Sequence, residues 1–228
     1  MHLELIELLR CPVQHRESVL VAATDNVQAR FVVDGVLGCP ECGAEYRIAN
    51  GVVHFEHFVR ATSVAEKIDA SSVNADSVVR LAAQLAIAEG RSVYALVGFS
   101  IPFALLLREM IPARLLLINA PPGNCNVQSP TFSQSPSGML QCDNVLPIVS
   151  RKLDGIALEA GALATWETNG DADSVVAQAA ATIRSGGRLV APVSATIPKD
   201  FRELARDSSV WVAERAATAS APVELRRR

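Results

Sequence analysis

From residue 73 onwards, short apolar runs alternate with segments whose apolar residues recur at helical spacing. The runs predict strands at 93–97, 115–118, 153–158 and 188–193. The intervening periodicity predicts helices at 73–89, 103–110, 173–184 and 199–206, with Ser185-Gly186-Gly187 ending the third. Strands that are apolar throughout suit a parallel sheet buried on both faces. The alternation predicts a doubly wound Rossmann-like α/β fold, in which strands at 210–213 and 223–225 form an antiparallel edge hairpin.

The first 58 residues follow a different pattern. After a helical segment at 3–9, they are dominated by short β-rich segments and turns. We expect strands at 18–23, 29–36 and 45–48, a turn at Asp25-Asn26, and hairpin tips at 38–43 and Asn50-Gly51. The chain is therefore divided into a small β domain (1–58), a polar linker (59–72) and a larger α/β domain (73–228).

Cysteine and histidine spacing gives the small domain its candidate chemistry. Cys39 and Cys42 form a C-x-x-C knuckle, whose two thiolates can bind one ion. Cys11 begins a second knuckle, in which Gln14 stands where another sulfur would be expected and His15 follows one position later. A zinc site of Cys11, His15, Cys39 and Cys42 is one interpretation, with His54 and His57 as weaker substitutes for His15. A metal-free ribbon with free thiols is the other.

Two stretches of the small domain carry a resemblance to a known family. LIELLRCPV and GCPECGAEYRIANGVVHF resemble the zinc-ribbon family that includes the activator subunit of transfer-RNA and protein methyltransferases. In that family the module is a partner or an extension of S-adenosylmethionine-dependent enzymes. The resemblance implies a protein partner, either a methyltransferase or a second copy of this chain.

The larger domain resembles a class I methyltransferase, but its cofactor turn departs from that family. In VYALVGFSIPFALLLRE, the family's acid corresponds to Ala95, and its three glycines to Val97, Phe99 and Ile101. Side chains at these positions would fill the space that the cofactor needs. The acid that binds the ribose in the family corresponds to Asn119.

The resemblance leaves few residues that could still contact S-adenosylmethionine. They are Gly98, Asn119 and Asp143, the last lying in a segment similar to the one that approaches the adenine. We therefore expect the crevice to be filled by side chains, which makes S-adenosylmethionine a doubtful cofactor.

The charge, the length of the apolar runs and the positions of cysteine and histidine limit the functions that this chain could have. The net charge of −3 and the scattered arginines do not indicate nucleic-acid binding. The longest apolar run, Val93 to Leu107, is shorter than the roughly 20 residues of a membrane span, so we expect a cytoplasmic protein without one. Cys125 and Cys142 are potential nucleophiles, but no histidine follows His57 to act as their base.

Three hypotheses follow from these patterns. The first is a non-catalytic methyltransferase-like protein, a pseudoenzyme that acts as a binding, scaffold or activator partner. The second is an active S-adenosylmethionine-dependent methyltransferase with an atypical cofactor loop. The third is a binder of another small molecule in the remodelled crevice.

Overall fold

A computed structural model describes residues 1–55, 73–121, 137–143, 145–167 and 172–217. Eleven strands form one mixed sheet in the order β1-β2-β3-β4-β7-β6-β5-β8-β9-β11-β10. The strands are β1 Val21–Gln28, β2 Phe31–Gly38, β3 Glu45–Ala49, β4 Val52–His54, β5 Val93–Val97, β6 Arg114–Ile118, β7 Ser137–Gln141, β8 Leu153–Leu158, β9 Ile183–Pro192, β10 Phe201–Arg206 and β11 Val210–Arg215. The helices are α1 Leu3–Ile6, α2 Ala75–Leu85, α3 Ile101–Met110, α5 Ala160–Glu167 and α6 Ala172–Thr182.

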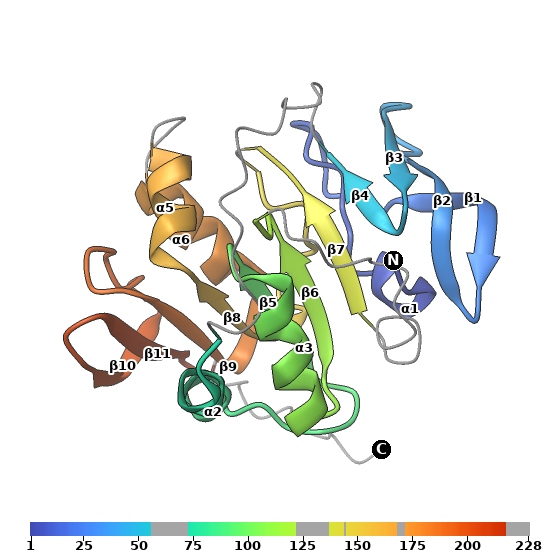
Figure 1. The fold of residues 1–228 in the computed structure, drawn as a ribbon. Helices are drawn as coiled ribbons and strands as arrows, with labels where there is room; N and C mark the ends of the chain where they lie inside the picture. Colours follow the sequence, from blue (N-terminus) through green and yellow to red (C-terminus); the bar gives the residue numbers. More distant parts are fainter. Residues whose placement is uncertain (56–72, 122–136, 144, 168–171, 218–228) are drawn as a thin grey trace, which may run out of the picture.

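The centre of the sheet is the predicted parallel, doubly wound arrangement. Strands β7, β6, β5, β8 and β9 are parallel neighbours, and helices cover both faces (Figure 1). Tyr94 and Leu96 of β5 belong to a core cluster shared with α2 and α3, whereas Val93, Ala95 and Val97 belong to one shared with α5 and α6. This alternation along one strand explains why its sequence is apolar throughout.

The N-terminal hairpins extend the same sheet. Strands β1 to β4 pair antiparallel in chain order, and β4 then pairs parallel with β7, where Val53 lies opposite Leu140. Leu5 and Leu37 from the N-terminal region lie in the same core cluster as Leu140. The two predicted regions are thus joined by strand pairing and by a common core, while the predicted linker at 59–72 lies outside the described residues.

Polar contacts reinforce that junction. The carboxylate of Glu4 accepts from Arg30 at 3.0 Å and from Arg114 at 2.7 Å, which connects the β1–β2 hairpin to the start of β6. Leu9 forms an antiparallel bridge with Ile148, and the Arg10 side chain donates to the carbonyl of Ile148 at 2.9 Å. The segment that carries Cys11 is therefore fixed against the connection between β7 and β8.

The local sequence predicted the bounds of most helices to within a few residues. The predicted helix at 73–89 is α2, where the Asn74 side chain accepts from the Asp76 N–H at the start. It ends at Ala86, which adopts a left-handed conformation with φ 50°, rather than at the predicted residue 89. The N-terminal helix is shorter than predicted, since α1 spans only Leu3–Ile6.

The turn predicted at Asp25-Asn26 is wrong. Both residues lie inside β1, at an irregularity in its pairing with β2. The chain reverses instead at Ala29-Arg30, where φ is 46° and 69°. The closing turn is not marked by residues that favour positive φ, so the hairpin register, set by pairing along eight-residue strands, determines its position.

The helix predicted at 199–206 is also wrong, because residues 201–206 form the edge strand β10. β10 pairs antiparallel with β11, from Phe201 opposite Arg215 to Arg206 opposite Trp211. Only Phe201 of β10 is buried, and the exposed residues carry no strong strand pattern. Pairing with a neighbouring strand therefore overrides local helix preference. The predicted edge hairpin exists, but β10 and β11 form it, and residues 223–225 lie outside the described part.

Ser185-Gly186-Gly187 is not a helix stop followed by a separate strand. These residues lie within β9, which begins at Ile183 directly after α6. At this junction the guanidinium of Arg215 donates to the carbonyl of Ala180 in α6 and to that of Ile183, the first residue of β9, both at 2.8 Å. The carbonyls of Ala181 and Thr182 accept from the backbone N–H groups of Arg151 and Lys152. Groups distant in sequence thus satisfy the carbonyls that the glycine turn was expected to satisfy.

None of the helices in the described part of the chain combines the length and apolarity needed to cross a membrane.

Candidate functional site

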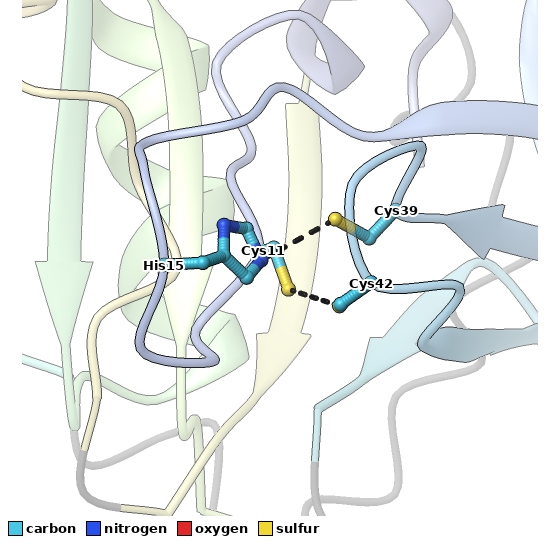
Figure 2. A group of neighbouring side chains, drawn as sticks. All are labelled: Cys11, His15, Cys39 and Cys42. Atoms are coloured by element: carbon cyan, nitrogen blue, oxygen red, sulfur yellow. Dashed lines mark hydrogen bonds between the residues drawn. The ribbon is translucent and has the colours of Figure 1, made fainter.

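Four potential metal ligands lie close together at the turn between β2 and β3. Cys11 and His15 come from the segment after α1, and Cys39 and Cys42 come from the turn between β2 and β3 (Figure 2). Their ligand atoms all lie within 4.8 Å of one another. Cys11 and Cys39 are buried, whereas Cys42 is exposed. The structure therefore brings together all four residues of the proposed Cys₃His set.

The distances between the ligand atoms fit a tetrahedrally coordinated zinc ion. Sulfurs bound to one zinc at about 2.3 Å lie about 3.8 Å apart, and a sulfur and an imidazole nitrogen lie about 3.6 Å apart. The Sγ atoms of Cys11 and Cys42 are 3.7 Å apart, and Cys39 Sγ is 3.5 Å from His15 Nε2. Two edges of the cluster thus have the lengths of a zinc tetrahedron, and the residues present fit the metal.

The orientation of His15 also suits a ligand. Its Nδ1 lies 2.5 Å from the carbonyl oxygen of Arg16, an oxygen that can only accept a hydrogen bond. Nδ1 therefore carries the proton, and the lone pair of Nε2 points to the cysteines. The hydrogen bond to Arg16 is also the main cause that raises the pKa of His15 to about 8. A zinc ion must displace the proton from Nε2, so binding should strengthen as the pH rises toward this value.

The backbone of the β2–β3 turn stabilises a thiolate at Cys39. Burial by itself would raise the pKa of this thiol, but hydrogen bonds from the backbone N–H groups of Cys42 and Glu41 outweigh it and lower the pKa to about 6. The C-x-x-C turn thus supplies an anionic sulfur near neutral pH, the form that binds a metal.

His54 and His57 were the weaker alternatives to His15 as the nitrogen ligand of the cluster. His54 lies in β4 and is not part of the cluster, and His57 lies outside the described residues. Gln14 is exposed. The insertion of one residue between Cys11 and the second ligand is absorbed by the segment after α1, which turns so that His15 faces the C-x-x-C knuckle (Figure 2).

The second candidate site is the crevice where the parallel strands end. Gly98 follows β5 with φ +83°, a conformation that favours glycine. A Cβ atom at Gly98 would overlap Cβ of Ala162 in α5 and would lie 3.3 Å from Cβ of Glu159. The close approach of α5 therefore accounts for this glycine without a cofactor.

Asn119 is hydrogen-bonded to the end of the neighbouring strand through both its amide nitrogen and its amide oxygen. Its side-chain amide donates to the carbonyl of Cys142 at 2.7 Å, and its side-chain oxygen accepts from the N–H of Cys142 at 2.8 Å. Asn119 also has φ 51°, which asparagine tolerates better than most residues. The residue that corresponds to the ribose-binding acid thus serves as a connector between the ends of β6 and β7.

Replacement of Asn119 by alanine should lower the free energy of unfolding by about 2 kcal/mol, because both hydrogen bonds between the Asn119 side chain and the backbone of Cys142 are lost. Asn119→Gly removes the same bonds but accepts the positive φ, so it separates their loss from backbone strain. Urea unfolding of both variants measures the effect. Wild-type stability in both would contradict the connector role.

Asp143 and the cysteines complete the strand-end candidates. Asp143 is exposed just after β7, next to the buried Cys142. Cys125 lies outside the described residues. Gly98, Asn119 and Asp143 all follow carboxyl ends of parallel strands, which is the edge where ligands of such sheets bind.

Side chains at the positions of the family's acid and glycines are packed into the protein. Ala95, Val97 and Ile101 are at most 4% exposed. Phe99 is partly exposed, and its ring lies 5.1 Å from that of Phe103. Three of these four residues are therefore core residues, and the fourth lies against the first turn of α3.

Two residues of these sites were missed by the sequence reasoning. Glu159 caps α5 by accepting from the N–H groups of Gly161 and Ala162. The Tyr46 hydroxyl lies 3.2 Å from Cys11 Sγ. An acid before a helix is a recognisable capping signal, whereas nothing in the local sequence relates Tyr46 to a cysteine 35 residues away.

The chain matches none of the family models searched and no curated protein. Among solved structures, it resembles a candidate S-adenosyl-L-methionine-dependent methyltransferase from Methanococcus maripaludis, with 9% identity over 63% of this chain and 85% of that chain, at a TM-score of 0.44. It also resembles the geranyl diphosphate C-methyltransferase of Streptomyces coelicolor (10% identity, 51% and 44% of the chains, TM-score 0.41) and TrmN of Thermus thermophilus (16%, 62% and 48%, 0.40). The chain thus covers less than half of the latter two. All three TM-scores are below 0.5, a likeness that assigns neither substrate nor activity to this chain.

Proposed function

We propose that this chain is a zinc-binding, methyltransferase-like protein that works as a non-catalytic binding or scaffold partner. The observation that carries the non-catalytic part is the use of the cofactor-turn residues for structure. Gly98 is closed off by α5, and the amide of Asn119 is occupied by the backbone of Cys142. A ligand at this edge would have to displace packed groups, at a cost that an active cofactor site does not have.

Zinc has a structural role in this proposal. Cys11, His15, Cys39 and Cys42 would all be ligands, so no coordination position remains open for a substrate. The ion would connect the segment after α1 to the β2–β3 turn. Because Arg10 next to Cys11 is bonded to Ile148, the centre would also stabilise the contact between the hairpins and the central sheet.

Calorimetry with S-adenosylmethionine tests the non-catalytic assignment. The zinc-loaded chain should give no saturable heat up to about 1 mM cofactor, because the residues of the turn are engaged in packing. A thermal-shift titration with S-adenosylhomocysteine provides a second readout. Saturable binding at micromolar concentration would overturn the assignment.

An active methyltransferase is the second candidate, and the exposed carboxylate of Asp143 at the end of β7 favours it. If the cofactor binds, Asp143→Ala should weaken binding, whereas Asp207→Ala, in the β10–β11 turn, should not. Loss of binding in the first variant only would place the cofactor at this edge.

The proposed partner is a protein, either a methyltransferase or a second copy of this chain. Size-exclusion chromatography with light scattering of the zinc-loaded protein measures self-association. Co-purification with an identified methyltransferase, lost after zinc removal, would support the scaffold role. A monomer that retains no such partner would contradict it.

A further inference from the structure

Tyr46 is the polar side chain in contact with the buried end of the metal cluster. It lies in β3 and is 3% exposed, and its hydroxyl oxygen is 3.2 Å from Cys11 Sγ. The ring packs against Phe55 with a centroid separation of 4.8 Å. Strand pairing places Tyr46 opposite Leu37, two residues before Cys39 in β2. Tyr46 thus lies on one of the two strands that flank the turn carrying Cys39 and Cys42.

The direction of this hydrogen bond depends on the state of Cys11. A thiol can donate or accept, but a thiolate can only accept. When Cys11 binds a cation it is a thiolate, so the Tyr46 hydroxyl must then be the donor. An O–H···S⁻ bond of this kind fixes the sulfur and withdraws part of its negative charge.

We infer that Tyr46 is a positioning residue of the metal centre, which donates its hydroxyl hydrogen to the Cys11 thiolate and thereby increases metal affinity and reduces the reactivity of that sulfur. The inference rests on the proposed zinc site. Its physical basis is the burial of both partners, since a buried tyrosine hydroxyl requires a partner and Cys11 is 1% exposed.

The role of Tyr46 also depends on which side of the metal cluster is buried. Cys42 is exposed and His15 is not buried, so one side of the cluster faces solvent. Cys11 and Cys39 form the buried side, and Tyr46 is bonded to Cys11 there. The hydroxyl thus stabilises the ligand whose charge has least access to water.

Tyr46→Phe tests the inference in the full-length chain, because phenylalanine keeps the ring and its packing on Phe55. Zinc affinity is measured by competition with a chromophoric chelator, and the coordination by the sulfur-to-metal charge-transfer bands of the cobalt(II) form. We expect zinc affinity to fall by about 10-fold to 100-fold, as for other outer-sphere partners of metal ligands, and the cobalt bands to shift. Alkylation of the Cys11 sulfur in the zinc form should also become faster.

Tyr94→Phe is the matched control, because Tyr94 is the other tyrosine of the chain and is also buried. Its hydroxyl donates to the carbonyl of Ala86 and accepts from Ala88 N–H, far from the cysteines in sequence. This variant should lose some stability but keep wild-type zinc affinity and cobalt bands. An equal fall in zinc affinity in both variants would assign the effect to general destabilisation and overturn the inference.

The remaining outcomes separate this inference from the metal proposal. Wild-type affinity and spectrum in Tyr46→Phe would overturn the role of Tyr46 and leave the zinc site standing. A wild-type chain that binds neither zinc nor cobalt would overturn both.

Discussion

Cys39→Ser should abolish stoichiometric zinc binding and lower the free energy of unfolding by about 4 kcal/mol when the wild-type protein is measured at free zinc 1,000-fold above its dissociation constant. The surroundings of Cys39 favour its thiolate, since hydrogen bonds from the backbone N–H groups of Cys42 and Glu41 lower its pKa to about 6. A serine hydroxyl at neutral pH is a poor zinc ligand. Elemental analysis and urea unfolding, with and without a chelator, measure both effects.

The matched control for this change is Cys142→Ala. Cys142 is also buried, at 3% exposure, but it lies beside Asn119 and outside the metal cluster. Its loss should reduce stability and leave one zinc per chain. Chelation should then destabilise the wild type and Cys142→Ala equally and have no effect on Cys39→Ser. Unchanged zinc content in Cys39→Ser would refute the assigned ligand set.

The free energy of unfolding should rise by about 2 kcal/mol between pH 6 and pH 8 because of the N-terminal amine. Met1 is 0% exposed, and its amino group donates to the carbonyls of Val32 at 3.0 Å and Gly51 at 2.7 Å. Two acceptors match the two N–H bonds of a neutral amine. Burial lowers the pKa of this group from 8.0 to about 4.

The sign follows from proton uptake on unfolding. Between pH 4 and pH 8 the amine is neutral in the folded protein and protonated in the unfolded chain, so the unfolded state binds more protons. Stability is therefore complete above pH 8 and is lost progressively as the pH falls toward 4. The slope approaches about 1.4 kcal/mol per pH unit for one proton. Burial lowers the pKa of the adjacent His2 as well, which adds a contribution of the same sign.

A chain with one glycine added before Met1 isolates the amine. The addition converts the amino group at this position into an amide that does not titrate, while His2, Glu4 and the metal ligands are unchanged. Chemical unfolding at several pH values in zinc-saturated buffer should give a shallower slope for this variant. The added residue must also fit between Met1 and the carbonyls of Val32 and Gly51, so overall stability should fall. Parallel pH profiles for the two proteins would contradict the assignment.

Three of the five parallel strands in the central sheet were predictable to within one residue, because burial on both faces requires a run of apolar residues. β7 was not predicted, and the strand predicted at 188–193 covers only part of β9. The predicted strands at 93–97 and 153–158 coincide with β5 and β8, and the strand at 115–118 differs from β6 by one residue. A strand at the edge of the sheet does not require such an apolar run. β10 buries only Phe201, so its sequence gave a helix prediction that pairing with β11 overrides.

The metal ligands were predictable for a different reason. A C-x-x-C spacing has few structural uses, and Cys11 and His15 are the only cysteine and histidine between His2 and Cys39. The sequence favoured His15 and left His54 and His57 as weaker candidates, because the contact itself depends on how the segment after α1 turns. The tertiary structure places the Nε2 atom of His15 at 3.5 Å from Cys39 and leaves His54 in β4.

By itself, the sequence determined the apolar parallel centre, the ligand types of the metal cluster and the loss of acid and glycines at the cofactor turn. The tertiary structure alone decided that β4 pairs with β7, that α5 closes the space at Gly98 and that Asn119 bridges to Cys142. The physical reason is the range of the interactions. Burial and turn preference act on neighbouring residues, whereas strand pairing, helix approach and hydrogen bonds such as that between Tyr46 and Cys11 join residues distant in sequence.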